Sequence, residues 1–178
     1  MSGARILEML REIEADTLRN SARLPSKVDE RPEWRGLGFQ LGGVRLVSAL
    51  GEVEEILKPP RVTALPRVRD WVLGVANVRG RLIPILDMHR FLGIAPTVPR
   101  VNWRILIVED NDLIAGLLVE QSLGLQHFHE DAMETGSPEG LPVLAPHIRG
   151  VFRQGGRVFF VINLRALIRD EAFLHVTE

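Results

Sequence analysis

The chain has 178 residues, no cysteine, and a formal net charge of −1 from 22 Lys and Arg against 23 Asp and Glu. The lack of cysteine excludes disulfides, zinc fingers and thiolate nucleophiles, and no apolar run approaches the roughly 20 residues of a membrane-spanning helix. With 46% hydrophobic residues and an N-terminus unlike a secretory signal, we expect a globular, cytoplasmic protein with a continuous core.

Residues 4–20 are predicted to form an amphipathic helix. Ile6, Leu10, Ile13 and Thr17 recur at the spacing of one helical face, and charged residues lie between them. The stretch 22–33 is polar and bounded by prolines, so it cannot continue this helix. We therefore expect residues 1–33 to be a helix and linker that extend from the main body at 34–178.

The main body is predicted to be mainly antiparallel β. Short apolar segments separated by Gly, Pro and Asn predict strands over 37–41, 44–50, 53–57, 71–78, 81–86, 105–109, 113–121, 147–153 and 157–162. Gly42-Gly43 lies between the first two and predicts a hairpin. Asp87 and Asn163 are suitable N-caps for short helical turns over 88–92 and 164–168.

An internal repeat indicates a duplicated β unit. At an offset of 76 residues six identities coincide, among them Gly74-Val75 on Gly150-Val151 and Gly80-Arg81 on Gly156-Arg157. Each copy of some 60 residues is too short to bury much core alone. The repeat therefore predicts two small, similar β-barrels packed around a shared apolar interior.

No assembled catalytic or metal site is visible in the sequence. His127 and His129 have a spacing that could hold a metal, but the other three histidines are isolated, so a polar pair in an acidic loop is the better interpretation. The usual hydrolase, phosphate-binding and zinc-protease motifs are absent. We expect a protein without enzymatic activity, metal or cofactor, and keep a metal-dependent enzyme as a remote alternative.

The charge distribution favours a protein partner. Residues 61–90 hold six Arg and two Asp, whereas residues 109–140 hold eight acids and no Lys or Arg. Trp71 and Phe91 lie among the arginines, as a single-strand nucleic-acid site would require, but aromatics are only 6% of the chain and the acidic stretch would repel a polyanion. Nucleic-acid binding is therefore the weaker alternative.

Asn77 and Arg79 stand out as polar residues in an otherwise apolar segment, which we expect to place them on one strand face. Under a structural interpretation, Asn77 bonds turn backbone and Arg79 pairs with an acid such as Glu55. Under a functional one, Arg79 is the central anchor of a recognition surface. The residues alone do not decide between the two.

A longer set of residues resembles the CheW family of chemotaxis adaptors. The most specific stretch is Asn77-Val78-Arg79-Gly80 followed by an apolar strand with Pro84 and a closing Asp87, and the similarity extends over residues 36–168. The N-terminal segment and Trp34 are most similar to the family members that serve type IV pilus signalling, with flagellar chemotaxis as the alternative.

The resemblance implies two SH3-like five-stranded barrels, the first mainly over 36–95 and the second mainly over 100–168, with exchange of chain between them. It implies a non-catalytic adaptor that couples the cytoplasmic tip of a methyl-accepting chemoreceptor to the regulatory domain of a CheA-type histidine kinase, with no direct membrane insertion. By position, the receptor-binding residues would be Val53, Glu55, Ile56, Gly74, Asn77 and Arg79. The kinase-binding residues would be Arg61, Val62, Thr63 and Leu65.

Two departures from the family pattern are visible. Val119-Glu120 stands where the family usually has Val-Asp, which puts local geometry in doubt. The second copy of the repeat has Arg153-Gln154-Gly155 where the first has Asn77-Val78-Arg79, so we expect no second equivalent groove.

Overall fold

The structure is a computed structural model, and it describes residues 31–177. Residues from Pro32 onward form one compact unit. Its strands are β1 (Glu33–Leu41), β2 (Val44–Ala49), β3 (Val53–Leu57), β4 (Val72–Val78), β5 (Arg81–Asp87), β6 (Arg104–Asp110), β7 (Leu113–Val119), β8 (Gln121–His129), β9 (Ile148–Gln154) and β10 (Arg157–Ile162). Its α-helices are α2 (Met88–Leu92), α3 (Leu164–Ile168) and α4 (Glu171–Leu174), and its 3-10 helices are η1 (Arg100–Asn102), η2 (Glu130–Ala132) and η3 (Pro142–His147).

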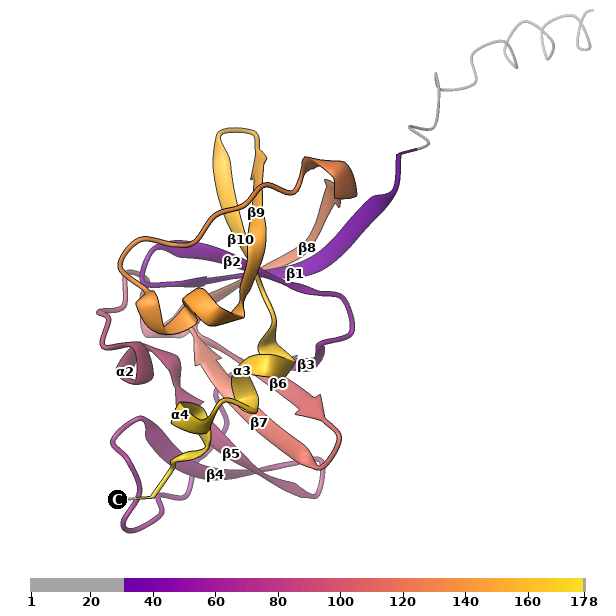
Figure 1. Ribbon diagram of the computed structural model, residues 1–178. Helices are drawn as coiled ribbons and strands as arrows, with labels where there is room; N and C mark the ends of the chain where they lie inside the picture. Colours follow the sequence, from indigo (N-terminus) through magenta and orange to yellow (C-terminus); the bar gives the residue numbers. More distant parts are fainter. Residues whose placement is uncertain (1–30, 178) are drawn as a thin grey trace, which may run out of the picture. The chain divides into compact units, whose positions relative to one another are not determined.

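The strands form two five-stranded sheets. Sheet A has the order β8-β1-β2-β10-β9 and sheet B the order β3-β6-β7-β5-β4. Figure 1 shows sheet A above sheet B. Most neighbouring strands are antiparallel, and each sheet contains one parallel pair, β10 with β2 and β5 with β7. The mainly antiparallel β architecture predicted from the sequence is confirmed.

Three apolar clusters fill the molecule. The largest takes Phe39 and Leu46 from sheet A and Leu106 and Leu117 from sheet B, so the two sheets share one core. A second cluster lies within sheet B around Ile83 and a third within sheet A, where the rings of Phe128 and Phe152 stack with centroids 4.3 Å apart. The shared interior expected from the repeat is therefore present.

The two copies of the repeat occupy equivalent places. The hairpin of β4 and β5 forms one edge of sheet B, and the hairpin of β9 and β10 forms the matching edge of sheet A. Each hairpin is followed by a short helix, and the caps are as predicted: Asp87 accepts from the backbone N–H of His89 and Arg90, and Asn163 from that of Ala166. The repeat therefore matches one hairpin and one short helix in each sheet.

The sheets do not follow the predicted division at about residue 95. β1 and β2 belong with β8, β9 and β10, so the exchange of chain is larger than a division into 36–95 and 100–168 suggests. β2 joins this sheet by pairing with β10, and β1 by pairing with β8, which was predicted only as the end of a strand over 113–121 and as an acidic loop. It pairs with β1 along nearly its whole length, from Glu33 opposite His129 to Gln40 opposite Gln121.

The remaining elements lie close to their predicted ranges. β1 begins earlier than expected, at Glu33, so Trp34 and the end of the predicted linker are part of a strand. α4 was not predicted; Asp170 caps it by accepting from the N–H of Ala172, and Phe173 is buried. The helix expected over 4–20 and the linker as far as residue 30 lie outside the described residues. In the described part of the chain, no helix is both long and apolar enough to cross a membrane.

Candidate functional site

The turn between β4 and β5 carries the two polar residues that the sequence singles out. Arg79 and Gly80 form this turn with φ of 52° and 81°. The prediction that Arg79 and Asn77 share one strand face is therefore wrong, because Arg79 lies in the turn and not in the strand. The Asn77 Oδ1 accepts a hydrogen bond from the Gly80 N–H at 2.9 Å, which holds the turn. Two consecutive residues with positive φ give the right-handed twist that a tight hairpin needs.

Arg79 connects this turn to the strand at the other edge of sheet B. Its Nη2 lies 2.8 Å from Oε1 of Glu55 in β3, and the two side chains are 79% and 25% exposed. An exposed ion pair contributes at most about 1 kcal/mol to stability. The pair positions the guanidinium while leaving most of it free for a partner, so the structural interpretation is confirmed and the functional one stays compatible with it.

Four of the six predicted receptor residues, which we call the turn surface, are exposed or partly exposed: Glu55, Ile56, Asn77 and Arg79. Ile56 is 38% exposed, which is unusual for an isoleucine in a sheet, but it follows Glu55 in β3 and so points to the other face of that strand. Val53 instead packs against the shared core. Gly74 is buried with φ of 135°, and a Cβ there would lie 2.0 Å from the carbonyl O of Thr63, so Gly74 acts on backbone packing.

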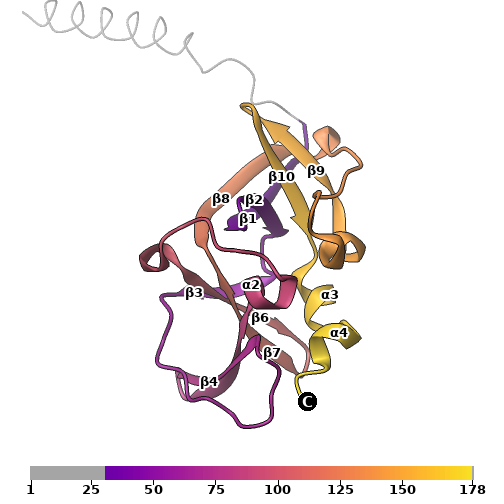
Figure 2. The same ribbon diagram turned by 90° about the vertical axis from the view of Figure 1, so that its left-hand side faces the viewer.

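The predicted kinase residues lie on the loop between β3 and β4, visible at the lower left of Figure 2. Thr63 pairs with Val75 of β4 through two backbone hydrogen bonds, of 2.8 and 2.9 Å. Arg61 and Leu65 are exposed, whereas Val62 is half-buried against the core of sheet B. We call residues 58–65 the bridging segment. Because it pairs directly with β4, the two predicted partner surfaces are neighbours in the fold.

A buried polar cluster at the junction of the two sheets was missed at the level of sequence. The His89 ring of α2 is 4% exposed, and its Nδ1 and Nε2 lie 3.3 Å from Oδ1 of Asp87 and 3.3 Å from Oε1 of Glu120, without the alignment of hydrogen bonds. It stacks on Trp103 with ring centroids 4.7 Å apart. The signal in the sequence was weak, because Glu120 is 31 residues from His89, and Asp87 and Glu120 drew attention only as a helix cap and as a departure from the family pattern.

Glu120 connects the elements around this cluster. Its two oxygens accept hydrogen bonds from the N–H of Gly42 at 2.9 Å, from the N–H and hydroxyl of Thr97, both at 2.7 Å, and from the amide of Gln40 at 3.2 Å. Burial acts to raise the pKa of Glu120, but these donors outweigh it and the pKa is lowered. The longer acid at this position is therefore fully accommodated, and the doubt about local geometry is resolved.

Asp87 has a similar balance. Burial acts to raise its pKa, while the His89 side chain and the N–H groups of Arg90 and His89 together lower it. Arg90 also lies 3.5 Å from the Asp87 carboxylate through its Nε. The cluster thus holds two ionised carboxylates at neutral pH with the donors that they need.

The histidines near the acidic stretch lie in β8 and not in a loop. The Nδ1 of His127 is 2.9 Å from the Glu33 carboxylate across the pairing of β8 with β1. Among residues 31–177, no group of three or more His, Asp or Glu side chains has the arrangement of a metal site.

Comparison with known proteins decides the family. A model of the CheW-like domain matches residues 35–172. The chain belongs to the CheW-like family. It is 41% identical over 169 residues to the protein PilI of Pseudomonas aeruginosa, covering 95% of this chain and 94% of that protein. It is 23% identical to the chemotaxis protein CheW of Thermotoga maritima, covering 80% of this chain and 92% of that one.

A solved CheW structure has the same fold. The scaffolding protein TtCheW from Thermoanaerobacter tengcongensis superposes with a TM-score of 0.68 at 22% identity, covering 79% of this chain and 96% of that protein. At this identity the likeness shows the fold alone. The two five-stranded sheets and their shared core are thus those of a CheW-like domain.

Within the CheW-like domain, the second hairpin differs from the first in its polar groups. Gly155 and Gly156 form its turn, and Arg153 pairs with Glu134 at 3.2 Å, with side chains 61% and 58% exposed. The segment around Glu134 bridges to Val151 of β9 as the bridging segment does to Val75 of β4. The bridge from a loop to the edge strand is thus present in both sheets, but the turn of the second hairpin carries no arginine. The expectation that there is no second equivalent groove stays a prediction.

Proposed function

We propose that this CheW-like protein is a non-catalytic adaptor that couples a methyl-accepting chemoreceptor to a CheA-type histidine kinase in the control of type IV pilus twitching motility. The similarity to PilI over almost the whole chain supports the pilus pathway over the flagellar one. The adaptor would be cytoplasmic and recruited to membrane-bound receptor arrays. Two closures, Thr63 with Val75 and Glu134 with Val151, support the finer expectation that each sheet is an SH3-like barrel.

The observation that carries the proposal is the Arg79 side chain, held by Glu55 at 2.8 Å yet largely exposed. Interfaces concentrate their binding energy in a few residues, and arginine is one of the types enriched among them. We assign receptor binding to the turn surface, with Val53 and Gly74 supporting it from below. We assign kinase binding to Arg61, Thr63 and Leu65 of the bridging segment, with Val62 as its buried support.

Replacing Arg79 with Ala is expected to weaken binding of a chemoreceptor-tip peptide by about 1–3 kcal/mol, roughly 5- to 150-fold in Kd, and to leave the fold intact. The fold should survive because the lost ion pair is exposed. The measurement is titration calorimetry with circular dichroism of both proteins. Arg153→Ala is the matched control, since it removes the exposed pair of the equivalent hairpin. Equal affinity of the Arg79 variant and the wild type would refute the role of Arg79.

Charge reversal at Arg61 is expected to weaken binding of the kinase regulatory domain about tenfold or more, and to change receptor affinity by less than about twofold. Arg61 is exposed, so the change acts on the surface; Val62→Asp is unsuitable, because it would bury a charge against the core of sheet B. Calorimetry against both partners is the test. A parallel loss of both affinities would mean that the two surfaces cannot be separated.

A further inference from the structure

A cleft of about 370 Å³ lies beside the bridging segment and was not predicted from the sequence. Pro59, Pro60 and Val62 form one wall, and Leu73, Trp103 and Leu118 contribute apolar surface. Arg90 and Arg100 also line it. Its size suits one or two side chains of a protein partner, and is small for a drug-sized ligand.

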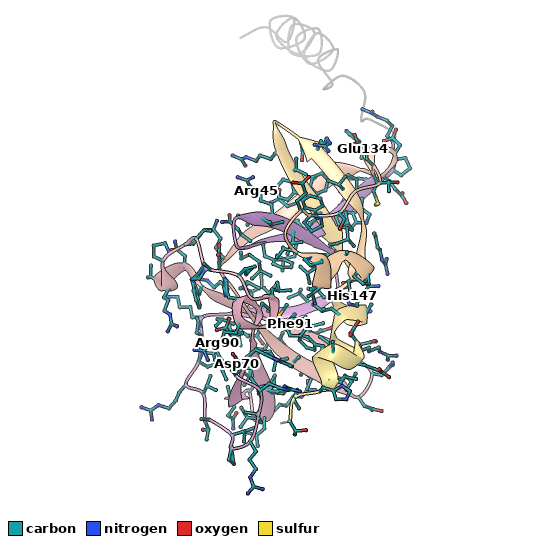
Figure 3. All side chains as sticks on the ribbon, turned by 60° about the vertical axis from the view of Figure 1, so that its left-hand side comes forward. Arg45, Asp70, Arg90, Phe91, Glu134 and His147 are labelled. Carbon is teal, nitrogen blue, oxygen red and sulfur yellow. The ribbon has the colours of Figure 1, made fainter. Side chains whose placement is uncertain are left out.

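The cleft is held in shape by its own contacts. The Trp103 indole N–H donates to the carbonyl O of Val98 at 2.9 Å, and one face of the ring stacks on the buried His89. Arg90 donates from Nη1 to the carbonyl O of Asp70 at 2.9 Å; Figure 3 shows these two residues side by side, next to Phe91. A preorganised cleft costs little ordering free energy when it binds.

The charges around the cleft select the partner. The Cζ of Arg100 lies 5.0 Å from the centre of the Trp103 ring, and Arg90 is 51% exposed at its side chain. Arg61, exposed on the adjoining segment, adds a third positive charge. The single acid that lines the cleft, Asp87, is buried and already accepts from two N–H groups. An apolar floor with a basic rim is complementary to an apolar side chain flanked by carboxylates.

We propose that this cleft is the anchor pocket for the kinase regulatory domain, and that it takes an apolar side chain flanked by Asp or Glu from that domain. The inference rests on the proposed function, because it places the anchor next to Val62 and Arg61 of the bridging segment. It adds Arg90, Arg100 and Trp103 to the kinase surface and states the chemistry of the partner's segment. The acid should pair with the two guanidinium groups, and the apolar side chain should lie against the partly exposed Val62 and Leu73, beside the edge of Trp103.

The test is calorimetry of wild type, Arg100→Glu and Arg157→Glu against the regulatory domain of a CheA-type kinase. Arg157 is the matched control, because it is also exposed but lies on β10 of sheet A. We expect Arg100→Glu to weaken binding about tenfold or more and Arg157→Glu to leave it within about twofold. If the wild type binds and Arg100→Glu binds equally well, the anchor pocket is refuted while the adaptor function stands.

If no kinase domain binds to the wild type, the proposed function is refuted. A second measurement then still tests whether the cleft binds an apolar side chain flanked by acids. The chain has three Trp residues, so the indole N–H signal of Trp103 can be followed by NMR after assignment with Trp103→Phe. The probe is the peptide acetyl-Glu-Leu-Phe-Glu-amide, with the Lys-flanked analogue as control. A saturable shift of the Trp103 signal with the acidic peptide alone supports the pocket. No shift, or equal shifts with both peptides, overturns it.

Discussion

Replacing Gly74 with Ala is expected to lower the free energy of unfolding by about 3–5 kcal/mol. The backbone at Gly74 has φ of 135°, a region that residues with a Cβ avoid, and the added carbon would lie 2.0 Å from the carbonyl O of Thr63. That carbonyl cannot retreat easily, because it accepts the Val75 N–H at 2.9 Å. Denaturant unfolding followed by circular dichroism measures the loss.

Gly51→Ala is the matched control. Gly51 also has a positive φ, of 92°, but an added Cβ would have nothing within 4 Å. Its replacement should cost about 1–2 kcal/mol from backbone strain alone. Equal losses at the two positions would show that the close approach of Thr63 contributes nothing.

Gly74→Ala should also affect function, because it would displace residues of the proposed binding surfaces. If Thr63 is displaced from Val75, the bridging segment moves, and Arg61 and Leu65 move with it. A Gly74→Ala protein that still folds is therefore expected to lose affinity for both proposed partners. Arg79→Ala should instead affect the receptor peptide alone, so comparing the two variants separates a structural residue from a contact residue.

Local sequence signals predicted the parts of the fold that depend on neighbours in the chain. Gly42-Gly43 has the positive φ values of a tight turn, and Asp87 and Asn163 cap the helices that follow β5 and β10. The pairing of Arg79 with Glu55 was foreseen as one option, because a lone arginine next to apolar strands needs an acid within reach.

Features that depend on distant pairing were not predicted. β8 has a mixed pattern, with Gly124 and Leu125 exposed and Phe128 buried, so alternation does not mark it as one strand. Its pairing with β1 across more than 80 residues and the pairing of β2 with β10 together form sheet A. The contact of His89 with Glu120 likewise depends on the parallel pairing of β5 with β7, whose strands are separated by β6 in the chain. The cleft beside Trp103 depends on the approach of two loops, between β3 and β4 and between α2 and β6, which no local pattern predicts.

Glu120→Gln is expected to destabilise the protein by about 2–4 kcal/mol at neutral pH. The carboxylate is fully buried and accepts four hydrogen bonds from Gln40, Gly42 and Thr97. An amide places two N–H donors where one of those oxygens now faces donors, so part of the set is left unsatisfied. Thermal and denaturant unfolding measure the effect, and Glu139→Gln, at an exposed acid, is the control.

The variant should also change how stability depends on pH. Because the folded-state pKa of Glu120 is lowered from its usual value of 4.5, its ionised form contributes stability that is complete above that value and is lost as pH falls through the folded pKa. The pKa of Asp87 is also lowered, so its contribution to stability depends on pH in the same direction. Burial raises the pKa of Glu52, so the contribution of Glu52 to stability depends on pH in the opposite direction. Both are present in wild type and variant, so the difference between the two proteins reports on Glu120 together with its coupling to Asp87 through His89.

The difference in stability between wild type and Glu120→Gln is therefore expected to be largest above about pH 5 and to shrink toward acid. The wild type loses the contribution of its carboxylate in that range, and the amide has none to lose. A difference that stays constant from neutral pH down to about pH 3 would mean that packing, and not the ionised carboxylate, explains the cost. Glu120 accepts hydrogen bonds from Gln40 in β1 and from Gly42 in the turn after β1, and it lies beside His89 in the helix that follows β5. The same titration would therefore measure what this carboxylate contributes to joining the two sheets.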